Sequence, residues 1–466
     1  MQYRSESDSV GTLNVPADAY YGVQSLRAQQ NFRISGQPMH PVFIDSLILI
    51  KRAAAQTNMQ AGMLSTETCS AICAACDRLL NGEMRDQFIA DAIQGGAGTS
   101  ANMNANEVIA NLANQMLGGA LGAYDRVHPN DHVNMSQSTN DVVPTAGKLT
   151  VLTLLPQLIA KLGELHDALM VKAAAFDGIL KMGRTQLQDA VPMRLGQSFK
   201  AFASAVRRDI QRLVAVGEEM RTLNLGGTAI GSAINVPAYY LRHIVPNLSS
   251  LTGQSLRQAE DLFDATQNLD CFVAVSGALK ACAVNLSKMS NDLRLMSSGP
   301  RTGIHEINLP ARQNGSSIMP GKVNPVIPEV VTQVAFRVAG NDITISMAAE
   351  AGQLELNAFE PVLFYALFES IQMMTGAVDT LTHNCVEGIT ANEEECLQYL
   401  ESSVGIVTAL CPYIGYIKAA EIAKRALATG EPVRLLVEQS GLLSAEQLAE
   451  LLDPAAMTEP STDTIA

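Results

Sequence analysis

Four loops of this 466-residue sequence are rich in hydroxyl and amide side chains and poor in charge. They are GGAGTSANMN (95–104), HPNDHVNMSQSTND (128–141), GRTQLQDAVP (183–192) and NGSSIMPGKVNP (314–325). Solvated connecting loops usually carry Lys, Glu and Asp, whereas Ser, Thr, Asn, Gln and Gly with one lysine can hold an anion by hydrogen bonds. We therefore expect these loops to bind an anionic ligand, with plain solvated connectors as the alternative.

Two short patterns in these loops imitate other kinds of site. GSSIMPGKVNP, from Gly315, looks like a phosphate-binding P-loop, but five residues instead of four separate its glycines and a valine follows its Gly-Lys pair. HPNDH, from His128 to His132, imitates a zinc motif, but Pro129 lies inside it and no third ligand is evident. We expect neither a P-loop nor a metal site here.

Three of the eight cysteines form another misleading pattern. Cys69, Cys73 and Cys76 have the spacing C-x3-C-x2-C, which iron–sulfur radical enzymes use to bind a cluster. The surrounding TETCSAICAACDRLLNG is rich in helix formers, and positions i, i+4 and i+7 share one helix face with Ile72 and Leu79. We expect buried core thiols rather than metal ligands.

The segment GSSIMPGKVNP resembles the signature of the aspartase/fumarase superfamily. HVNMSQSTND, GTSANMNANEVIAN and GRTQLQDAVP are similar to the family's other active-site segments, and SSVGIVTALCPYIGY resembles the C-terminal part of fumarases and aspartases. The resemblance covers essentially the whole chain. Within the family, KVNPVIPE, GGAGTSANMNANE, QLQDAVPM and AAEAGQLELNAFEPV look like the aspartate ammonia-lyase branch.

The resemblance implies a carbon–nitrogen lyase that reversibly deaminates L-aspartate to fumarate and ammonia, by anti-elimination through an aci-carboxylate intermediate. It implies no cofactor and no resident metal, and leaves activation by a divalent metal open. Preorganised hydroxyls, amides, backbone N–H groups and a lysine suit the doubly charged intermediate. Ser316 would be the catalytic base, with backbone donors near Gly315 and Ser317 stabilising its oxyanion. The implied substrate-binding residues are Thr99, Ser138, Thr139, Asn140, Thr185, Gln186, Lys322 and Asn324.

Two positions depart from the pattern of many family members. Gln186 stands where many have a histidine that pairs with the glutamate matching Glu329, and a glutamine cannot relay a proton. Cys411 stands where an asparagine is expected. Loss of hydroxide from malate needs a general acid, whereas an ammonium leaves as neutral ammonia. No histidine lies in 183–192 or 314–325, which favours aspartate, although His132 or a water could supply a proton.

Two other functions stay open. One is fumarate hydratase, and the other is a non-catalytic scaffold of the same fold, as in the lens crystallins of this superfamily. Intact Ser316, Lys322 and Asn324 argue against the scaffold. The segment from His128 to His132 is also similar to a secondary anion site of fumarases, and that role is left open.

Long helices must position these loops. Segments 145–176, 193–223, 264–298, 325–350 and 356–384 contain little Gly or Pro and far exceed the mean helix of about 11 or 12 residues. In 264–298 large and small residues alternate at spacings of 4 and 3, which predicts a heptad seam; they are Phe272, Ser276, Leu279, Ala283, Leu286, Ser290, Leu293 and Ser297. We predict a mainly all-α subunit with a central long-helix bundle.

We expect three parts in this subunit: a mixed, mostly helical N-terminal domain (1–140), the bundle (141–391) and a small helical C-terminal domain (392–466). In the last part, Thr429-Gly430 predicts a helix end, and Ser444 with Gln447 predicts a capping box.

Composition limits the partners and the location. Charged residues make up 17% of the chain, against about 25% in an ordinary soluble domain, which suggests surface buried in an oligomer. The resemblance implies a homotetramer with active sites built from three subunits.

The net charge of -14 and the lack of a basic stripe argue against nucleic acid as a partner. We expect no membrane partner and a cytoplasmic location, because no signal peptide is evident and the longest charge-free run, Arg221 to Arg242, is rich in Gly, Pro, Asn and Thr.

Overall fold

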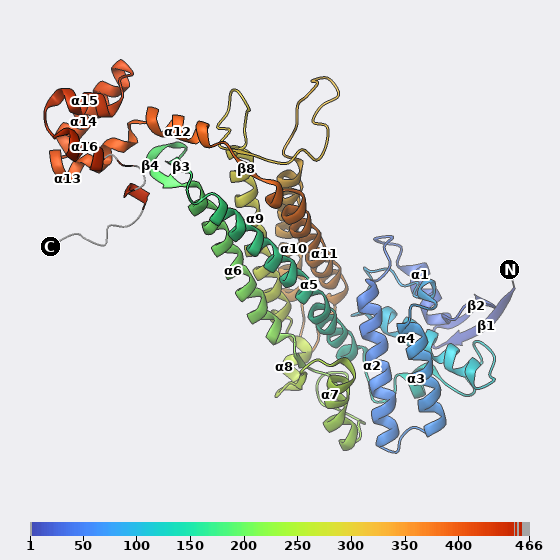
Figure 1. The fold of residues 1–466 in the computed structure, drawn as a ribbon. Coiled ribbons are helices and arrows are strands. Elements are labelled where there is room, and N and C mark those ends of the chain that lie inside the picture. The colour runs from blue at the N-terminus through green and yellow to red at the C-terminus, as the bar shows by residue number, and fades with distance from the viewer. Residues whose placement is uncertain (1, 452, 454–455, 459–466) are drawn as a thin grey trace. The chain divides into compact units, whose positions relative to one another are not determined.

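The computed structural model describes residues 2–451, 453 and 456–458. Helices dominate this part of the chain, and its strands form only two-stranded sheets. The prediction of a mainly all-α subunit is therefore confirmed (Figure 1). The residues form two compact units: Met1–Ile159, Gln211–Ala283 and Phe336–Thr375 make unit 1, and Ala160–Ile210, Val284–Ala335 and Gly376–Ala466 make unit 2.

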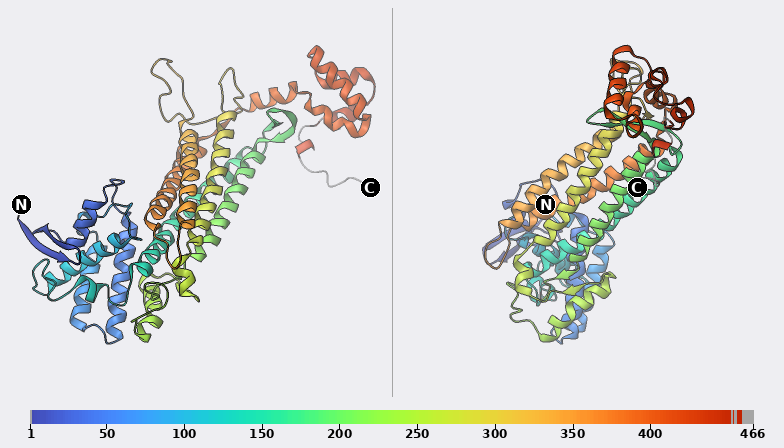
Figure 2. Two further views of the ribbon diagram at one scale, coloured as in Figure 1. Left: turned by 180° about the vertical axis from the view of Figure 1, so that it is seen from behind. Right: turned by 90° about the vertical axis from the view of Figure 1, so that its left-hand side faces the viewer.

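Five helices of 25 to 37 residues run through the middle of the sequence, close to the five predicted segments. They are α5 (Thr139–Ala175), α6 (Leu195–Glu219), α9 (Asp270–Met296), α10 (Val326–Glu350) and α11 (Glu360–Asn384). In each unit, the parts of these helices that belong to it lie side by side (Figures 1 and 2). Side-by-side packing of this kind explains why such long helices are stable.

The predicted seam on α9 is buried. Phe272, Leu279 and Leu293 are fully buried, and the small residues Ser276 and Ser290 alternate with them at 2% and 0% exposure. Ser276 Oγ donates a 2.7 Å hydrogen bond to Asp342 on α10, so a short polar side chain also finds a partner in the seam. The long helix begins at Asp270 rather than at residue 264, where the predicted segment starts, because α8 (Leu262–Gln267) is a separate short helix.

Unit 1 holds the N-terminal elements and a helix pair from the middle of the chain. The antiparallel strands β1 (Tyr3–Asp8) and β2 (Gly11–Pro16) precede the helices, and the short strands β5 (Thr222–Leu223) and β6 (Arg257–Gln258) pair in parallel. The helices are α1 (Val23–Asn31), α2 (Pro41–Gln60), α3 (Thr66–Leu80), α4 (Thr99–Met116), α7 (Ala238–Thr252) and α8.

The cysteine cluster lies on α3, as predicted. Cys69 and Cys76 are buried and Cys73 is half-buried, and the Sγ atoms of Cys69 and Cys73 lie 4.0 Å apart. Burial of Cys76 among core side chains raises the pKa of its thiol, which keeps it in the neutral form. Cys69 and Cys76 are therefore buried core residues of the helix, as expected, whereas Cys73 is only partly buried.

Unit 2 holds a hairpin and the C-terminal helices. The hairpin pairs β3 (Leu180–Thr185) with β4 (Gln188–Arg194), and β7 (Ile307–Asn308) pairs with β8 (Thr390–Ala391). The helices that follow are α12 (Glu393–Ser402), α13 (Cys411–Ile414), α14 (Tyr416–Thr429), α15 (Val433–Ser440) and α16 (Ala445–Leu451). Gly430, at φ 72°, ends α14 as predicted. The predicted capping box also forms, because Ser444 and Gln447 exchange two backbone-to-side-chain hydrogen bonds.

The domain boundaries predicted at 140 and 391 fall where elements begin. Helix α5 begins at Thr139, and α12 begins at Glu393. The two compact units divide the chain differently, since the line between them passes through the long helices. The division into three domains stays a prediction.

Within the part of the chain that the structure describes, three helical stretches are long and apolar enough to cross a membrane, judged by length and composition: Thr139–Ala175, Asp270–Met296 and Glu360–Gly388. Their most apolar windows are 78%, 44% and 61% buried inside the protein. Helix packing accounts for most of this apolar surface on the first and third. The absence of a membrane partner stays a prediction.

Candidate active site

Thr99 is the first residue of α4. Gly98 before it has φ 84°, and an added Cβ would lie 2.7 Å from Val143 Cγ1, so only glycine fits this entry to the helix. The Thr99 hydroxyl donates to the Gly96 carbonyl at 2.7 Å. The segment 95–104, expected to be a polar loop, is therefore helical from Thr99 onwards, and Asn104 itself is fully buried.

The buried asparagines of α4 bind the backbone and side chains of neighbouring loops. Asn104 Oδ1 accepts from the Ala90 N–H at 3.1 Å, and its Nδ2 donates to the Gln87 carbonyl at 2.9 Å. Asn102 and Asn106 both donate to Asn134 Oδ1, at 3.2 and 3.1 Å. Amides are stable in the core when they satisfy loop groups in this way, a role that composition alone does not reveal.

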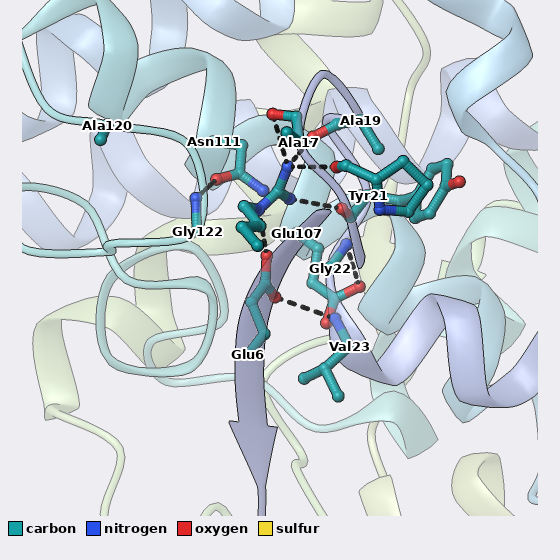
Figure 3. Close-up of polar contacts among 12 residues, drawn as sticks. Glu6, Ala17, Ala19, Tyr21, Gly22, Val23, Glu107, Asn111, Ala120 and Gly122 are labelled. Carbon is teal, nitrogen blue, oxygen red and sulfur yellow. Dashed lines mark hydrogen bonds and ion pairs between the residues drawn. The ribbon is translucent and has the colours of Figure 1, made fainter. Parts of the chain in front are cut away.

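A buried carboxylate fixes α1 to α4. Glu107 accepts hydrogen bonds from the backbone N–H groups of Gly22, Gln24 and Ser25 at 2.9 to 3.0 Å, and from the Ser25 hydroxyl. Figure 3 shows Glu107 beside Gly22 and near Glu6, which accepts from the Val23 N–H. Burial raises the pKa of Glu107, while these hydrogen bonds oppose the rise. Glu107 thereby caps the start of α1 and anchors it to the helix that Thr99 begins.

A fully buried lysine supports the loop that carries Ser138, Thr139 and Asn140. Lys51 Nζ, on α2, donates to Asn134 Oδ1 at 2.8 Å and to Gln137 Oε1 at 2.9 Å. Desolvation lowers the pKa of Lys51 to about 7, and the charge of Asp141 opposes this shift. Lys51 therefore fixes the loop through the side-chain amides of Asn134 and Gln137.

Asp141 fixes the other end of the same loop. Its carboxylate accepts from the backbone N–H groups of Ser138, Gly226 and Thr228 at 2.9 to 3.0 Å. Burial raises the pKa of Asp141 to about 6, despite these hydrogen bonds and the charge of Lys51. Residues 138–140 are thus held between a buried lysine and a buried carboxyl group.

The three predicted substrate residues of this loop keep polar atoms close to one another. The Asn140 N–H donates to Ser138 Oγ at 3.2 Å, and Asn140 Nδ2 donates to the Ala229 carbonyl at 2.8 Å. Thr139 Oγ1 accepts from Asn102 Nδ2 at 3.3 Å. These contacts connect the loop to the first turns of α4, so unit 1 brings together Ser138, Thr139 and Asn140 and links them to the helix that Thr99 begins.

A cavity of about 450 Å³ in unit 1 is lined by Thr99 and by the segment His128–Asn130. Arg27, the cation in its wall, is ion-paired with Asp8 at 2.8 Å. His128 Nδ1 accepts from two backbone N–H groups of the turn Pro129–Val133, and His132 Nδ1 accepts from the His128 N–H. The Nδ1 atoms of both histidines thus accept hydrogen bonds within this turn. The secondary anion site at 128–132 stays a prediction.

Thr185 and Gln186 lie at the tip of the β3–β4 hairpin in unit 2. Thr185 is paired with Gln188, and the two turn residues Gln186 and Leu187 have φ values of 55° and 64°. The predicted polar loop 183–192 is therefore mostly strand, with its exposed turn at 186–187. Sequence periodicity missed the strands because both are short and one contains a bulge next to Gly183.

Ser316 lies in a loop that aims backbone donors at its hydroxyl. Ser316 Oγ accepts hydrogen bonds from the N–H groups of Ile318 and Met319, both at 3.2 Å. These two amides, rather than the expected Ser317 amide, are the donors. Backbone N–H groups that point at a serine hydroxyl in this way can stabilise its oxyanion form.

The two arms of the Ser316 loop are held together by one backbone hydrogen bond and one side-chain hydrogen bond. The Gly315 N–H donates to the Lys322 carbonyl at 2.9 Å, and Asn324 Nδ2 donates to the Gly315 carbonyl at 2.7 Å. A Cβ on Gly315 would lie 2.3 Å from the Lys322 carbonyl oxygen, so the close approach requires glycine. Unit 2 thus brings Ser316, Lys322 and Asn324 into one loop.

The predicted site residues fall into two groups. Thr99 and 138–140 belong to unit 1, whereas Thr185, Gln186 and the Ser316 loop belong to unit 2. Among the residues that the structure describes, no hydrogen bond joins the hairpin tip to the Ser316 loop. Glu329, the partner expected for a histidine in other family members, lies 3.8 Å from Arg294 Nη2. The individual substrate-binding roles stay predictions.

One group of side chains away from these loops could bind a metal by geometry. Ligand atoms of Glu164, Asp379 and His383 lie within 4.8 Å of one another. Lys161 Nζ lies 2.9 Å from both carboxylates, and His383 Nε2 lies 3.3 and 3.6 Å from them, so both carboxylates already have ion-pair partners. The group is therefore explained as a surface ion-pair network.

Sequence reasoning missed the buried ionic residues that support the loops. Lys51 and Asp141 lie beneath 134–141, and Glu306 contacts the β3–β4 hairpin. The signal available for Lys51 was a lysine directly after the apolar run LILI in a helix. Glu306 lies in an irregular segment and gives no such signal.

Replacing Lys51 by methionine should change how stability depends on pH. Because the pKa of Lys51 falls from 10.5 to about 7 on folding, the unfolded chain binds more protons between these values, and stability rises with pH there. Relative to Lys51→Met, the wild-type free energy of unfolding should rise by up to about 1.4 kcal/mol per pH unit above pH 7. Urea denaturation of both proteins from pH 7 to 9.5 measures this slope, and a constant difference would contradict a neutralised Lys51.

Comparison with known proteins agrees with this geometry. A model of the family described as "Lyase" matches residues 11–340, and a model described as "Fumarase C C-terminus" matches residues 406–459. An aspartate ammonia-lyase from Bacillus sp. is 52% identical over 457 residues, which is 98% of each chain.

Two solved structures share the fold. One is a Brucella melitensis protein described as fumarate lyase:delta crystallin, at 49% identity and a TM-score of 0.95 over 98% of this chain and all of that one. The other is a class II fumarase from Schistosoma mansoni, at 34% identity and a TM-score of 0.96 over 99% of this chain and all of that one. The chain therefore belongs to the aspartase/fumarase superfamily of lyases.

Proposed function

We propose that this chain catalyses the reversible deamination of L-aspartate to fumarate and ammonia as a carbon–nitrogen lyase, without a cofactor. The observation that carries the proposal is the Ser316 hydroxyl, which accepts two backbone N–H bonds inside the signature loop. Identity of about half the residues with the Bacillus aspartate ammonia-lyase over nearly the whole chain supports the same reaction.

The reaction begins with removal of the proton on the carbon beside a carboxylate. Ser316, as its oxyanion, takes this proton, and the C–H electrons move into the carboxylate to give the aci-carboxylate. The C–N bond then breaks, nitrogen keeps its electron pair and leaves as ammonia, and the double bond of fumarate forms. The amides of Ile318 and Met319 stabilise the Ser316 oxyanion, since they already point at Oγ.

The remaining predicted residues bind the two carboxylates and the amino group. Lys322 and Asn324 supply a cation and an amide for a carboxylate, and Thr99, Ser138–Asn140 and Thr185 supply hydroxyls and an amide. Gln186 can accept a hydrogen bond from the ammonium through its amide oxygen. Exposure of Gln186 at the hairpin tip leaves its side chain free to meet a ligand.

Aspartate is favoured over malate because the leaving groups differ. An ammonium leaves as a neutral molecule, whereas hydroxide needs a proton from a general acid. In the loops of unit 2 that carry predicted site residues, Gln186 stands in place of a histidine. Fumarate hydration is the second candidate, supported by the 34% identity with the class II fumarase.

A direct assay separates these two reactions. The purified protein should form fumarate from L-aspartate, measured by ultraviolet absorbance, with little or no formation from L-malate under the same conditions. Release of ammonia, measured separately, should match the fumarate formed from aspartate. Faster interconversion of malate and fumarate than ammonia release from aspartate would assign the chain to the hydratases.

Removing the Ser316 hydroxyl tests whether this serine is the catalytic base. Ser316→Ala should lower kcat by about a thousandfold or more, the scale seen when a catalytic nucleophile or base is removed. The fold should stay intact, because a loop hydroxyl contributes little packing. Ser317→Ala is the matched control, since it removes the adjacent hydroxyl and keeps the backbone, and it should keep near wild-type turnover. Activity of Ser316→Ala within about tenfold of wild type would exclude Ser316 as the base.

We further propose that the chain forms a homotetramer with active sites composed of several subunits, acts in the cytoplasm, and binds neither nucleic acid nor membrane. An apolar stripe on α10 supports the assembly. Phe336, Ile343 and Met347 follow one another at helical spacing and are 69%, 63% and 67% exposed in the isolated chain. A soluble protein normally buries such a stripe against a partner.

Composite sites predict complementation between two inactive variants. Ser316→Ala chains and Thr185→Ala chains, unfolded together and refolded, should regenerate some sites that contain both native residues. Recovered activity should exceed that of each variant refolded alone, which is the control. Mixed tetramers, confirmed by a mass tag on one variant, without any recovery would show that each site lies within one subunit.

A further inference from the structure

Glu306 is a fully buried carboxylate that the proposed chemistry does not use. It lies in unit 2 directly before β7, in the segment that connects α9 to the Ser316 loop. Its Oε2 lies 3.0 Å from Lys181 Nζ, and its Oε1 accepts a hydrogen bond from Arg184 Nη1. Both cations come from β3, and Arg184 immediately precedes Thr185.

The main chain of Glu306 is itself held on both sides. Its N–H donates to the Met296 carbonyl at the end of α9, and its carbonyl accepts from the Asn392 N–H, both at 2.9 Å. The next two residues pair with β8 as the short strand β7. The carboxylate therefore projects from a fixed segment, and the hairpin is the element that it restrains.

Arg184 is held on a second side by an aromatic ring. Its guanidinium carbon lies 5.4 Å from the centre of the Tyr399 ring on α12. The Tyr399 hydroxyl donates to the Gly303 carbonyl at 3.1 Å, which fixes the ring. A guanidinium that is both ion-paired and stacked has little freedom, so the backbone at Thr185 is fixed as well.

Glu306 is one of two carboxylates that belong to this part of unit 2. Its own carboxylate faces Lys181 and Arg184, whose side chains are only 7% and 18% exposed. Asp189, the partner of Arg184 across the hairpin, accepts a hydrogen bond from Ser403 Oγ at 2.8 Å. Glu306 therefore orders the two largely buried cations, and no net positive charge is left over near the turn.

We propose that Glu306 is a positioning residue for substrate binding, because it fixes Lys181 and Arg184 so that the hairpin presents Thr185 and Gln186 to a dicarboxylate. This inference rests on the proposed function, since it assumes that the hairpin tip meets the substrate.

The main test compares Glu306→Gln with wild type in the aspartate assay on the intact assembly. Glutamine keeps the shape and removes the charge that orders the two cations. KM for L-aspartate should rise about tenfold or more while kcat changes less than about threefold, because a misplaced contact weakens binding before it affects the base. Asp177→Asn is the matched control. It removes the carboxylate 3.1 Å from Arg194 at the base of the same hairpin, and its KM should stay within about twofold of wild type.

A second variant keeps the test decisive if Glu306→Gln does not fold. Arg184→Lys keeps the positive charge but loses the planar contact with Tyr399 and the guanidinium geometry, so its KM should also rise several-fold. The double variant Glu306→Gln/Arg184→Lys should have about the same KM as the worse single variant, because both changes disrupt one contact.

The outcomes separate this inference from the proposed function. Folded Glu306→Gln or Arg184→Lys with a KM within about twofold of wild type would overturn the positioning role, while wild-type aspartate turnover keeps the function. A rise in KM that Asp177→Asn reproduces would also overturn it, because any loss of hairpin stability would then suffice. A wild-type protein that does not deaminate aspartate would refute the function itself.

Discussion

A charged side chain buried inside a protein needs an ion pair or hydrogen bonds, because burying an unpaired charge costs far more free energy than burying an unpaired amide. Several loops of this subunit depend on that constraint. Lys51 and Asp141 lie beneath one of them, Glu107 fixes the start of α1 to α4, and Glu306 faces two cations of the hairpin. Lys51, Asp141 and Glu107 contact the backbone or amides of neighbouring segments, and Glu306 contacts two charged side chains, so each segment has few alternative conformations.

This arrangement explains why the site loops themselves contain few charges. The rigid supports are supplied from the core, which leaves the loops to present hydroxyls, amides and backbone N–H groups. Such neutral donors can be oriented in advance toward a developing negative charge without an opposing charge of their own. At Ser316 the supports are hydrogen bonds between Gly315, Lys322 and Asn324, and the donors belong to Ile318 and Met319.

The helices could be predicted from the sequence because their signals are local. Periodic burial placed α9 and its seam, and the capping pair Ser444 and Gln447 placed the start of α16. The β3–β4 hairpin and the first turn of α4 could not be predicted from the sequence, since each depends on contacts with distant segments. The site segments were found by resemblance, whereas the charges beneath them depend on tertiary packing. Lys51 and Asp141 are 90 residues apart in sequence and influence each other's pKa only in the folded chain.

The apolar stripe on α10 also affects how the energetics of this protein should be measured. In the proposed assembly, covering Phe336, Ile343 and Met347 is part of folding, so association and folding are one equilibrium. The melting temperature should then rise with total protein concentration, and dilution alone should favour the unfolded chain. Newly synthesised subunits are most at risk of aggregation while partners are scarce, because the stripe is uncovered until they meet.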